Sequence, residues 1–370
     1  MNSNERVALL RLHLAVGHRG DLAIDLLSRF GGAREVFRRR PAELAGLEGM
    51  TPRSLERLLA PEGGRLADEE LRHSEREGVG LLFRGTSAYP EPLRELPEMP
   101  LVLFVRGEWR ADDARALGVV GSRRPTPYGL RQARRFAGRL ASWGVCVISG
   151  LARGIDVAAQ EAALESGGRT LAVFGSGLGR VYPPEHRALA RRIVSEGRGA
   201  LLSEFPFETP PRSYHFPRRN RLLSGLSRLL LVVEAGERSG SLITADWALR
   251  QGRTVYVVPG RVDQPEGRGT LELLRDGAAP AIDPEDLRTE LGLPVSAEGE
   301  AAADSRARKP LPGPLGVALD GLFAEEDRWT ADRLAGRLGL EPSRLSVEIG
   351  RLEVQGRLLR AADGAYVLAD

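Results

Sequence analysis

Cysteine, lysine and long apolar runs are what the 370-residue sequence lacks. Cys146 is the only cysteine, so an intramolecular disulfide is excluded and a thiolate metal cluster would lack ligands. The five histidines never pair at the spacing of a helical metal site, and we expect neither a metal nor a cofactor. No run of about 18 apolar residues predicts a membrane span. Without a signal-peptide pattern at the N-terminus, the cytoplasm is the expected compartment.

The basic residues are almost all arginine. Lys309 is the single lysine among 53 basic residues, which stand against 50 acidic ones. Codon bias in a GC-rich genome would produce this composition, so one arginine alone indicates little. Only a local excess of bases over acids points to an anionic partner. Residues 214–225, YHFPRRNRLLSG, have three arginines and no acid.

Residues 1–77 predict a helical domain of the helix-hairpin-helix or SAM-like kind, since apolar residues recur at helical spacing. The stretch LAGLEGMTPRSLERLL predicts two short helices around a glycine turn, with Thr51 as N-cap and Pro52 at the first helical position. Met50 stands where such a turn usually has a second glycine. A structural role and a contact with a DNA backbone both remain open.

Residues 78–291 alternate strand-like and helix-like segments, which predicts an α/β fold: an extended Rossmann-like parallel sheet covered on both faces. LLFRG and LVLFVRG, upstream, are two further strand candidates that would extend the sheet. The expected strands are 116–120, 145–149, 170–174, 200–204, 228–235 and 254–260, and the expected helices are 128–142, 154–166, 184–197 and 240–251.

Residues 292–313 are rich in Ala, Glu, Pro and Gly and predict a linker. Residues 314–370 predict three helices and a hairpin around Asp363-Gly364, the order of a winged helix. Its expected recognition helix has Arg344 and Arg351 with Glu348 between them, and acids outnumber bases in the domain. Contact with double-stranded DNA and contact with a protein partner therefore both remain open.

Ligands of an open parallel sheet bind outside the carboxyl ends of its strands, so the segments after the strands are the candidate site. Glycines, arginines and hydroxyl residues there suit an anion. The alternative for each is an ordinary turn or helix N-cap, and Asp156 is expected to cap or accept from the second loop. The candidates are Gly121, Ser122, Arg123, Arg124 and Thr126; Gly150 and Arg153; and Ser239, Gly240 and Ser241.

The segment 214–225 is predicted to lie in a loop that starts near Phe205. Its arginines Arg218, Arg219 and Arg221 would hold phosphates, with at least one turned inward to fix the loop to the sheet. Phe216 is the best base-stacking candidate, beside Tyr214, a combination that single-stranded nucleic-acid sites need. Asn220 is expected to brace the loop. The alternative is a surface loop whose arginines pair with acids elsewhere.

Catalytic patterns are missing. GSGLG at 175–179 is followed neither by a clear ribose-binding acid nor by an immediate helix, and there is no P-loop and no nucleophile elbow. None of the loops brings two carboxylates together for acid-base work. We expect a binding protein without catalytic residues.

Taken together, these blocks resemble the DNA processing protein A (DprA, or Smf) family. VVGSRRPTPYG, SGLARGID, FPRRNRLLSGLS, VVEAGERSGSLITA and GRTVYVVPG occur in the family's order. The resemblance implies a homodimer, formed through the Rossmann-like domain, that binds single-stranded DNA and loads the RecA recombinase during natural transformation. It also implies that the GSR and FPRRNR segments form the DNA pocket. Gln160 and Leu271 depart from the family's usual His and Asn.

Two other hypotheses remain. A phosphoribohydrolase-like enzyme acting on nucleoside monophosphates would use the same scaffold, with Glu234 or Glu237 as its acid. A protein-interaction scaffold would use the arginines to bridge acidic partners.

Overall fold

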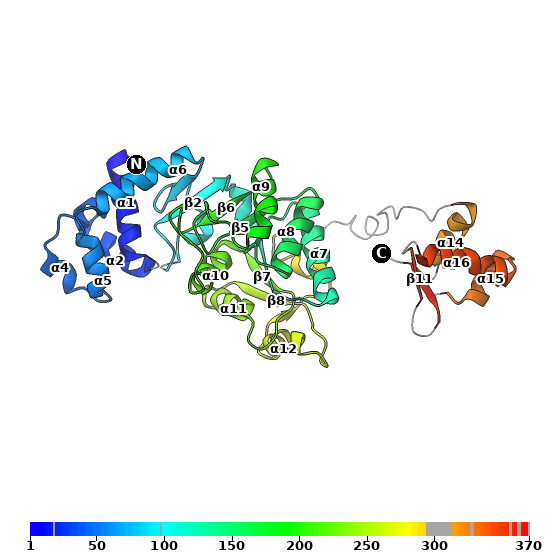
Figure 1. Ribbon diagram of the computed structural model, residues 1–370. Coiled ribbons are helices and arrows are strands. Elements are labelled where there is room, and N and C mark those ends of the chain that lie inside the picture. Colours follow the sequence, from blue (N-terminus) through cyan, green and yellow to red (C-terminus); the bar gives the residue numbers. More distant parts are fainter. Residues whose placement is uncertain are drawn as a thin grey trace. The chain divides into compact units, whose positions relative to one another are not determined.

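The computed structural model describes residues 1–17, 19–96, 98–293, 313–325, 329–354, 357–360 and 364–368. The chain divides into two compact units, Met1–Pro294 and Val295–Asp370 (Figure 1). Within the described residues, no helix combines the length and apolar character that crossing a membrane requires.

The first unit begins with helices, as predicted. Thr51 Oγ1 accepts the backbone N–H of Ser54 at 3.1 Å, and Pro52 is the first residue of its helix. The predicted start of the second helix of the hairpin is therefore confirmed. Leu10 and Leu12 share a hydrophobic cluster with Phe104 of the sheet. A separate domain ending at residue 77 stays a prediction. The helices are α1 (Ser3–Val16), α2 (Gly20–Phe30), α3 (Ala33–Val36), α4 (Pro41–Ala45), α5 (Pro52–Leu59) and α6 (Gly63–Arg76).

A nine-stranded sheet forms the centre of the described first unit, in the order β1-β2-β6-β5-β4-β3-β7-β8-β9. The strands from β6 to β9 in that order pair in parallel, whereas β1 and β2 pair antiparallel. The two upstream segments thus extend the sheet, as predicted, but their antiparallel direction was not predicted. The short strand β9 was not predicted. The bounds are β1 (Gly80–Phe83), β2 (Val102–Gly107), β3 (Leu117–Val120), β4 (Val147–Ser149), β5 (Thr170–Val173), β6 (Gly199–Ser203), β7 (Leu229–Val232), β8 (Thr254–Val257) and β9 (Ala279–Pro280).

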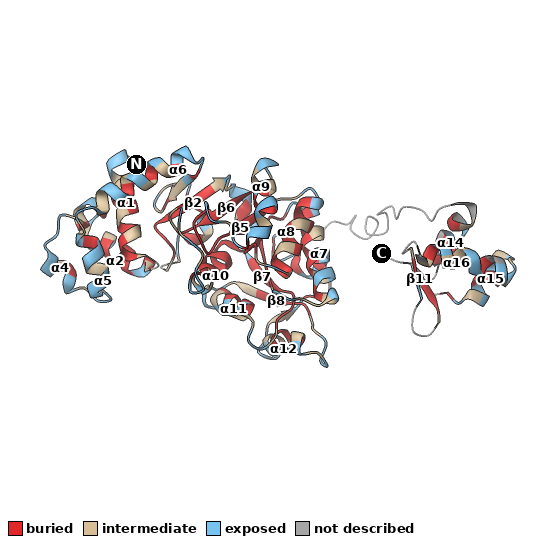
Figure 2. Cartoon of the chain, in the orientation of Figure 1, coloured by how far each residue is buried: buried red, intermediate tan, exposed pale blue. Residues whose placement is uncertain are grey.

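Helices cover both faces of the sheet, and the buried residues gather between the layers (Figure 2). Leu117 and Val119 of β3 pack with α7 and α8, whereas Val120 packs on the opposite face with α10 and α11. This alternation follows from the two-residue period of a strand. The helices are α7 (Pro127–Ser142), α8 (Ile155–Glu165), α9 (Arg187–Ser195), α10 (His215–Leu226), α11 (Gly240–Arg250) and α12 (Arg268–Arg275), with 3-10 turns at Glu91–Leu93, Ala111–Arg115, Pro184–His186, Pro265–Gly267 and Pro284–Leu287.

The prediction of a loop over 214–225 is wrong, because most of this segment is the helix α10. Leu222, Leu223 and Leu226 bury one side of the helix in the core beneath the sheet. Pro217 lies in the first turn, where its missing N–H costs no intrahelical hydrogen bond. The clustered arginines and the proline favoured a loop in the sequence pattern. The helix forms because burial of its second half stabilises it.

The second unit has its own core around Leu319, Trp329, Leu334 and Leu352. Three helices precede a strand pair, as predicted, while the winged-helix assignment itself stays a prediction. Most of the expected linker (294–312) and Asp363 of the expected hairpin lie outside the described residues. The elements are α14 (Gly313–Glu325), α15 (Ala331–Leu338), α16 (Pro342–Val354), β10 (Leu358–Arg360) and β11 (Tyr366–Leu368).

Candidate nucleic-acid interface

A cavity of ≈ 770 Å³ opens where the segments after β3 and β7 diverge. After β3 the chain winds through β4, β5 and β6 toward one edge of the sheet, and after β7 it winds toward the other, so the two strands flank the switch point. Such a crevice is the expected ligand site of an open parallel sheet. The predicted residues that line it are Gly121, Ser122, Arg123, Arg124, Phe216, Arg219, Asn220, Ser239, Gly240 and Ser241.

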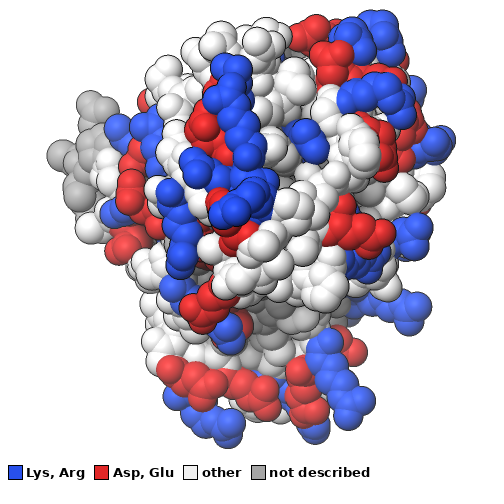
Figure 3. Space-filling view, turned by 90° about the vertical axis from the view of Figure 1, so that its left-hand side faces the viewer, with Lys and Arg blue, Asp and Glu red and all other residues white. Residues whose placement is uncertain are grey.

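Exposed arginines surround this cavity. Arg123, Arg124, Arg212 and Arg238 line it, and none of them forms an ion pair with a described residue. The helical end differs, because basic and acidic side chains lie intermixed on the face in Figure 3. Pairs such as Arg65 with Glu69, at 2.6 Å, neutralise each other. Because unpaired guanidinium groups attract phosphate, the cavity suits an anionic chain.

An aromatic stack forms one wall of the cavity. The guanidinium carbon of Arg123 lies 5.5 Å from the centroid of the Phe216 ring, and the Tyr182 ring lies 5.5 Å from Phe216 on a tilted plane. Gly175 makes room for this ring, since a Cβ there would lie 2.8 Å from Phe216 Cδ1. Tyr182 is 40% exposed, so a base could reach the stack from solvent.

Arg219 forms the floor of the cavity rather than its rim. It is 4% exposed, its Nη1 donates to the carbonyl of Val173, and its Nε donates to Asn220 Oδ1 at 3.2 Å. Burial lowers the pKa of Arg219 to about 10, against the opposing effect of the Asp156 carboxylate, so the group stays charged at neutral pH. A Cβ at Gly150 would lie 2.1 Å from Arg219 Nη1. Gly150 therefore makes space for the guanidinium and does not line the cavity.

The start of α11 closes another side. Ser239 is the N-cap, and its hydroxyl contacts that of Ser241 at 2.7 Å. Asn220 Nδ2 donates to the carbonyl of Gly240 at 3.3 Å, which ties α10 to α11 and agrees with the expected bracing role. Free backbone N–H groups at a helix N-terminus favour an anion, so these residues add to the electrostatic character of the cavity.

A buried carboxylate holds the loop after β3 in place. Glu234, 5% exposed, accepts the backbone N–H of Thr126 at 3.0 Å and also its hydroxyl. The Glu234 carbonyl accepts the N–H of Ser122 at 2.7 Å. The Thr126 hydroxyl in turn caps α7 through the N–H of Gly129 at 3.1 Å. Thr126 thus supports the loop from behind and does not line the cavity.

Three predicted arginines lie away from the cavity lining. Arg153 pairs with Glu185 at 2.6 Å, and Arg218 stacks over Tyr214 with its guanidinium carbon 5.3 Å from the ring centroid. Arg221 is 3% exposed and forms a buried ion pair with Glu204 at 2.5 Å. The phosphate-holding role predicted for Arg221 is therefore corrected: it is a buried structural cation.

Sequence reasoning missed Tyr182, Arg212 and Arg238, which line the cavity. All three stand in the segments after strands, but only their spatial position distinguishes them from other loop residues. Asp156 accepts the N–H of Gly150 at 3.1 Å, as expected, and burial raises its pKa, with Arg219 acting in the opposite direction.

The two departures from the family pattern lie outside the cavity lining. Gln160 is fully buried, and its Nε2 donates to the carbonyl of Leu171 at 3.1 Å, so it belongs to the packing of α8 on the sheet. Leu271 lies in α12. Neither departure changes the residues that line the cavity.

Known proteins resemble this chain in sequence. Residues 80–292 match the family model of DNA recombination-mediator protein A. Protein Smf of Escherichia coli is 38% identical over 325 residues, covering 86% of this chain and 85% of its own. DNA processing protein DprA of Bacillus subtilis is 38% identical over 216 residues, covering 58% of this chain and 72% of its own.

Solved structures show the same similarity. The X-ray structure of DNA processing protein A from Streptococcus pneumoniae superposes with a TM-score of 0.65 and 29% identity, covering 78% of this chain and 98% of its own. A structure of DNA processing protein A from Helicobacter pylori, which concerns its single-stranded DNA binding mode, gives a TM-score of 0.50 at 29% identity, covering 56% of this chain and 93% of its own.

Proposed function

The chain belongs to the DNA recombination-mediator protein A family, and we propose that it binds single-stranded DNA in the cavity between the β3 and β7 segments. In this role it protects incoming single strands and loads the RecA recombinase onto them during natural transformation. The relative from Helicobacter pylori, which binds single-stranded DNA, supports the choice of ligand.

One observation supports the proposal most directly: unpaired cations and a stacking ring meet in one cavity. Arg123 contributes to both features, since it lines the cavity without an acidic partner among the described residues and lies over Phe216. Phosphates would bind the rim arginines and bases would stack on the Phe216 and Tyr182 rings. Neither contact depends on base identity, so the binding tolerates any sequence.

The partners are proposals that rest on family membership. They are RecA, a second copy of the chain bound through the Rossmann-like domain, and either double-stranded DNA or a protein at the unit that contains α14–α16. The cytoplasm is the proposed compartment, because RecA and its DNA meet there.

The hydrolase hypothesis has less support than DNA binding. The Glu234 carboxylate is buried and occupied by Thr126, and Glu237 pairs with Arg268 at 3.0 Å. A general acid needs a proton-transfer position beside the substrate, which a carboxylate buried behind the loop does not offer.

A titration that follows fluorescence anisotropy tests the proposal. Labelled oligothymidylate, the same length of mixed-sequence single strand, and its duplex are compared at moderate salt. Both the full chain and the fragment of residues 1–293 are titrated. We expect the two single strands to bind with similar affinity, and we expect the fragment to bind the duplex more weakly than either single strand. Equal binding of duplex and single strands to this fragment, or no binding of either single strand by the full chain, contradicts the proposal.

A further inference from the structure

The segment 204–213 joins the helical N-terminal part of the first unit to the DNA cavity. It follows β6 and precedes α10, and its last three residues, Pro211, Arg212 and Ser213, line the cavity. Its first residues instead contact α1 and α6. One end of the segment therefore faces the proposed ligand and the other faces helices that are absent from the cavity lining.

His13 of α1 makes the innermost of these contacts. Its Nε2 lies 2.8 Å from the carbonyl oxygen of Glu204, and because a carbonyl only accepts, the ring donates from Nε2. His13 is 3% exposed, and burial lowers its pKa, so the neutral form is favoured. The Glu204 carboxylate pairs with Arg221, which connects the same point to α10. Glu204, a single buried residue, thus links α1 and its own segment to α10, the helix that contributes Phe216 and Arg219 to the cavity.

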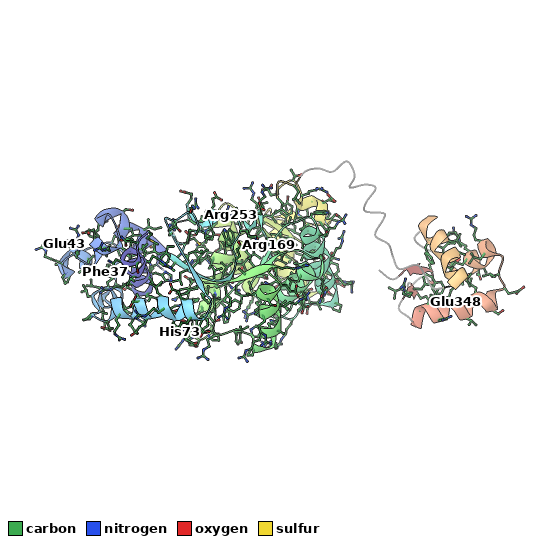
Figure 4. All side chains as sticks on the ribbon, turned by 90° about the horizontal axis from the view of Figure 1, so that it is seen from above. Phe37, Glu43, His73, Arg169, Arg253 and Glu348 are labelled. Carbon is green, nitrogen blue, oxygen red and sulfur yellow. The ribbon has the colours of Figure 1, made fainter. Side chains whose placement is uncertain are left out.

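Helix α6 holds the middle of the segment. The backbone N–H of Phe207 donates to Glu70 Oε1 at 2.8 Å, and the Phe207 ring meets the edge of the His73 ring at 5.0 Å between centroids. Figure 4 labels His73 on α6. In the loop after β5, the N–H groups of Gly177 and Gly179 donate to the carbonyls of Thr209 and Phe207, each at 2.9 Å. Both α6 and the loop after β5 thus hold the segment before it reaches the cavity.

We infer that His13 is a positioning residue for single-stranded DNA binding: through its hydrogen bond to Glu204 it fixes the cavity wall formed by residues 211–213. The inference rests on the proposed function and assigns a task to the helical N-terminal part that needs no DNA contact of its own. Glu70 has the same task at Phe207. Loss of either contact leaves the arginines in the sequence but loosens the wall that places Arg212.

The test uses the full chain with three substitutions. His13→Leu replaces the imidazole with an apolar side chain of similar size and so removes the hydrogen-bond donor. His13→Gln keeps an N–H donor that is separated from Cα by the same number of bonds as His Nε2. Leu26→Ala, in the buried core of α2, is the control for general destabilisation of the helical part. Oligothymidylate affinity is measured by anisotropy at a temperature where every variant is folded, and amide hydrogen exchange is measured over residues 205–213.

We expect His13→Leu to weaken binding about fivefold, the factor of one lost hydrogen bond, and to speed exchange over 205–213. His13→Gln should restore both, and Leu26→Ala should lower the melting temperature without changing affinity. Wild-type affinity in His13→Leu, or an equal loss in Leu26→Ala, overturns the inference. If the wild type binds no oligothymidylate, the proposed function fails and the exchange data alone decide on the hydrogen bond. If His13→Leu does not fold, Glu70→Leu makes the same comparison.

Discussion

The carboxylate of Glu234 accepts both the backbone N–H, at 3.0 Å, and the hydroxyl of Thr126, although 108 positions separate the two residues. Glu234 follows β7 and Thr126 ends the loop after β3, so this contact joins the two sides of the switch point. The loop that presents Arg123 is thereby fixed before any ligand binds. A preorganised loop reduces the ordering cost of binding.

Glu234→Gln tests this contact. An amide is neutral and keeps only one acceptor oxygen, so the two donors of Thr126 must share it and both lose a charge-assisted hydrogen bond, at a cost of about 1–3 kcal/mol. We expect a lower melting temperature and weaker oligothymidylate binding. Thr126→Ser, which keeps both donors, is the matched control and should retain wild-type values. A wild-type melting temperature for Glu234→Gln would contradict the assigned role.

Gly150→Ala tests the space that Arg219 occupies. The new methyl group would lie 2.1 Å from Nη1 and 2.5 Å from the central carbon of the guanidinium, so the side chain must move. We expect weaker single-strand binding in a protein that still folds, because the floor of the cavity changes. Gly64→Ala, in α6 with its nearest atom at 3.9 Å, should bind like the wild type. The account is wrong at this point if both variants bind equally well.

Arg221→Met tests the assignment of Arg221 as a buried structural cation. Removing it leaves the Glu204 carboxylate buried without its partner, which costs about 3–5 kcal/mol of folding free energy. Denaturant unfolding should show this loss, and the double variant Glu204→Gln/Arg221→Met should regain part of it. A single variant as stable as the wild type would show that Arg221 lies at the surface.

His13 predicts a pH dependence of stability. Burial lowers its pKa in the folded state, while the unfolded chain keeps the ordinary value of about 6.5. The neutral ring therefore contributes stability that is fully present above pH 6.5 and is lost as the pH falls below it, because the unfolded state then binds the extra proton. The groups that act on His13 electrostatically are Glu204 and Arg221.

The measurement compares the wild type with His13→Gln. Burial also lowers the pKa of His215, and that contribution is common to both proteins and cancels in the difference. The free energy of unfolding of the wild type minus that of His13→Gln should be constant above about pH 7.5 and decrease toward pH 5. A difference that is independent of pH over this range would contradict a neutral, buried His13.

Strands and most helices of the first unit were predictable because short apolar runs alternate with segments whose apolar residues recur at helical spacing. Helix α10 was not, since Pro217 and three arginines precede the leucines, and only Leu222, Leu223 and Leu226 reveal its buried side. The sequence also could not distinguish the arginines that line the cavity from those that are buried in ion pairs. Arg123 and Arg221 look alike in sequence, and only folding brings Glu204 beside the second.

The glycines illustrate the same limit. Their places after strands indicated turns, but the need for Gly150 and Gly175 comes from side chains distant in sequence, Arg219 and Phe216. Sequence patterns record local conformation, whereas close approach across the sheet edge depends on the assembled fold.

The salt dependence of oligothymidylate binding by Arg123→Ala tests the central claim most directly. Each phosphate contact on a single strand contributes about 0.7 to the slope of log affinity against log salt. We predict a slope reduced by about that amount, with weaker binding to oligothymidylate and oligodeoxyadenylate alike. Arg134→Ala, which removes an arginine paired with Glu161 and Glu165 outside the cavity lining, should keep the wild-type slope. An Arg123→Ala protein with wild-type affinity and slope would contradict the account.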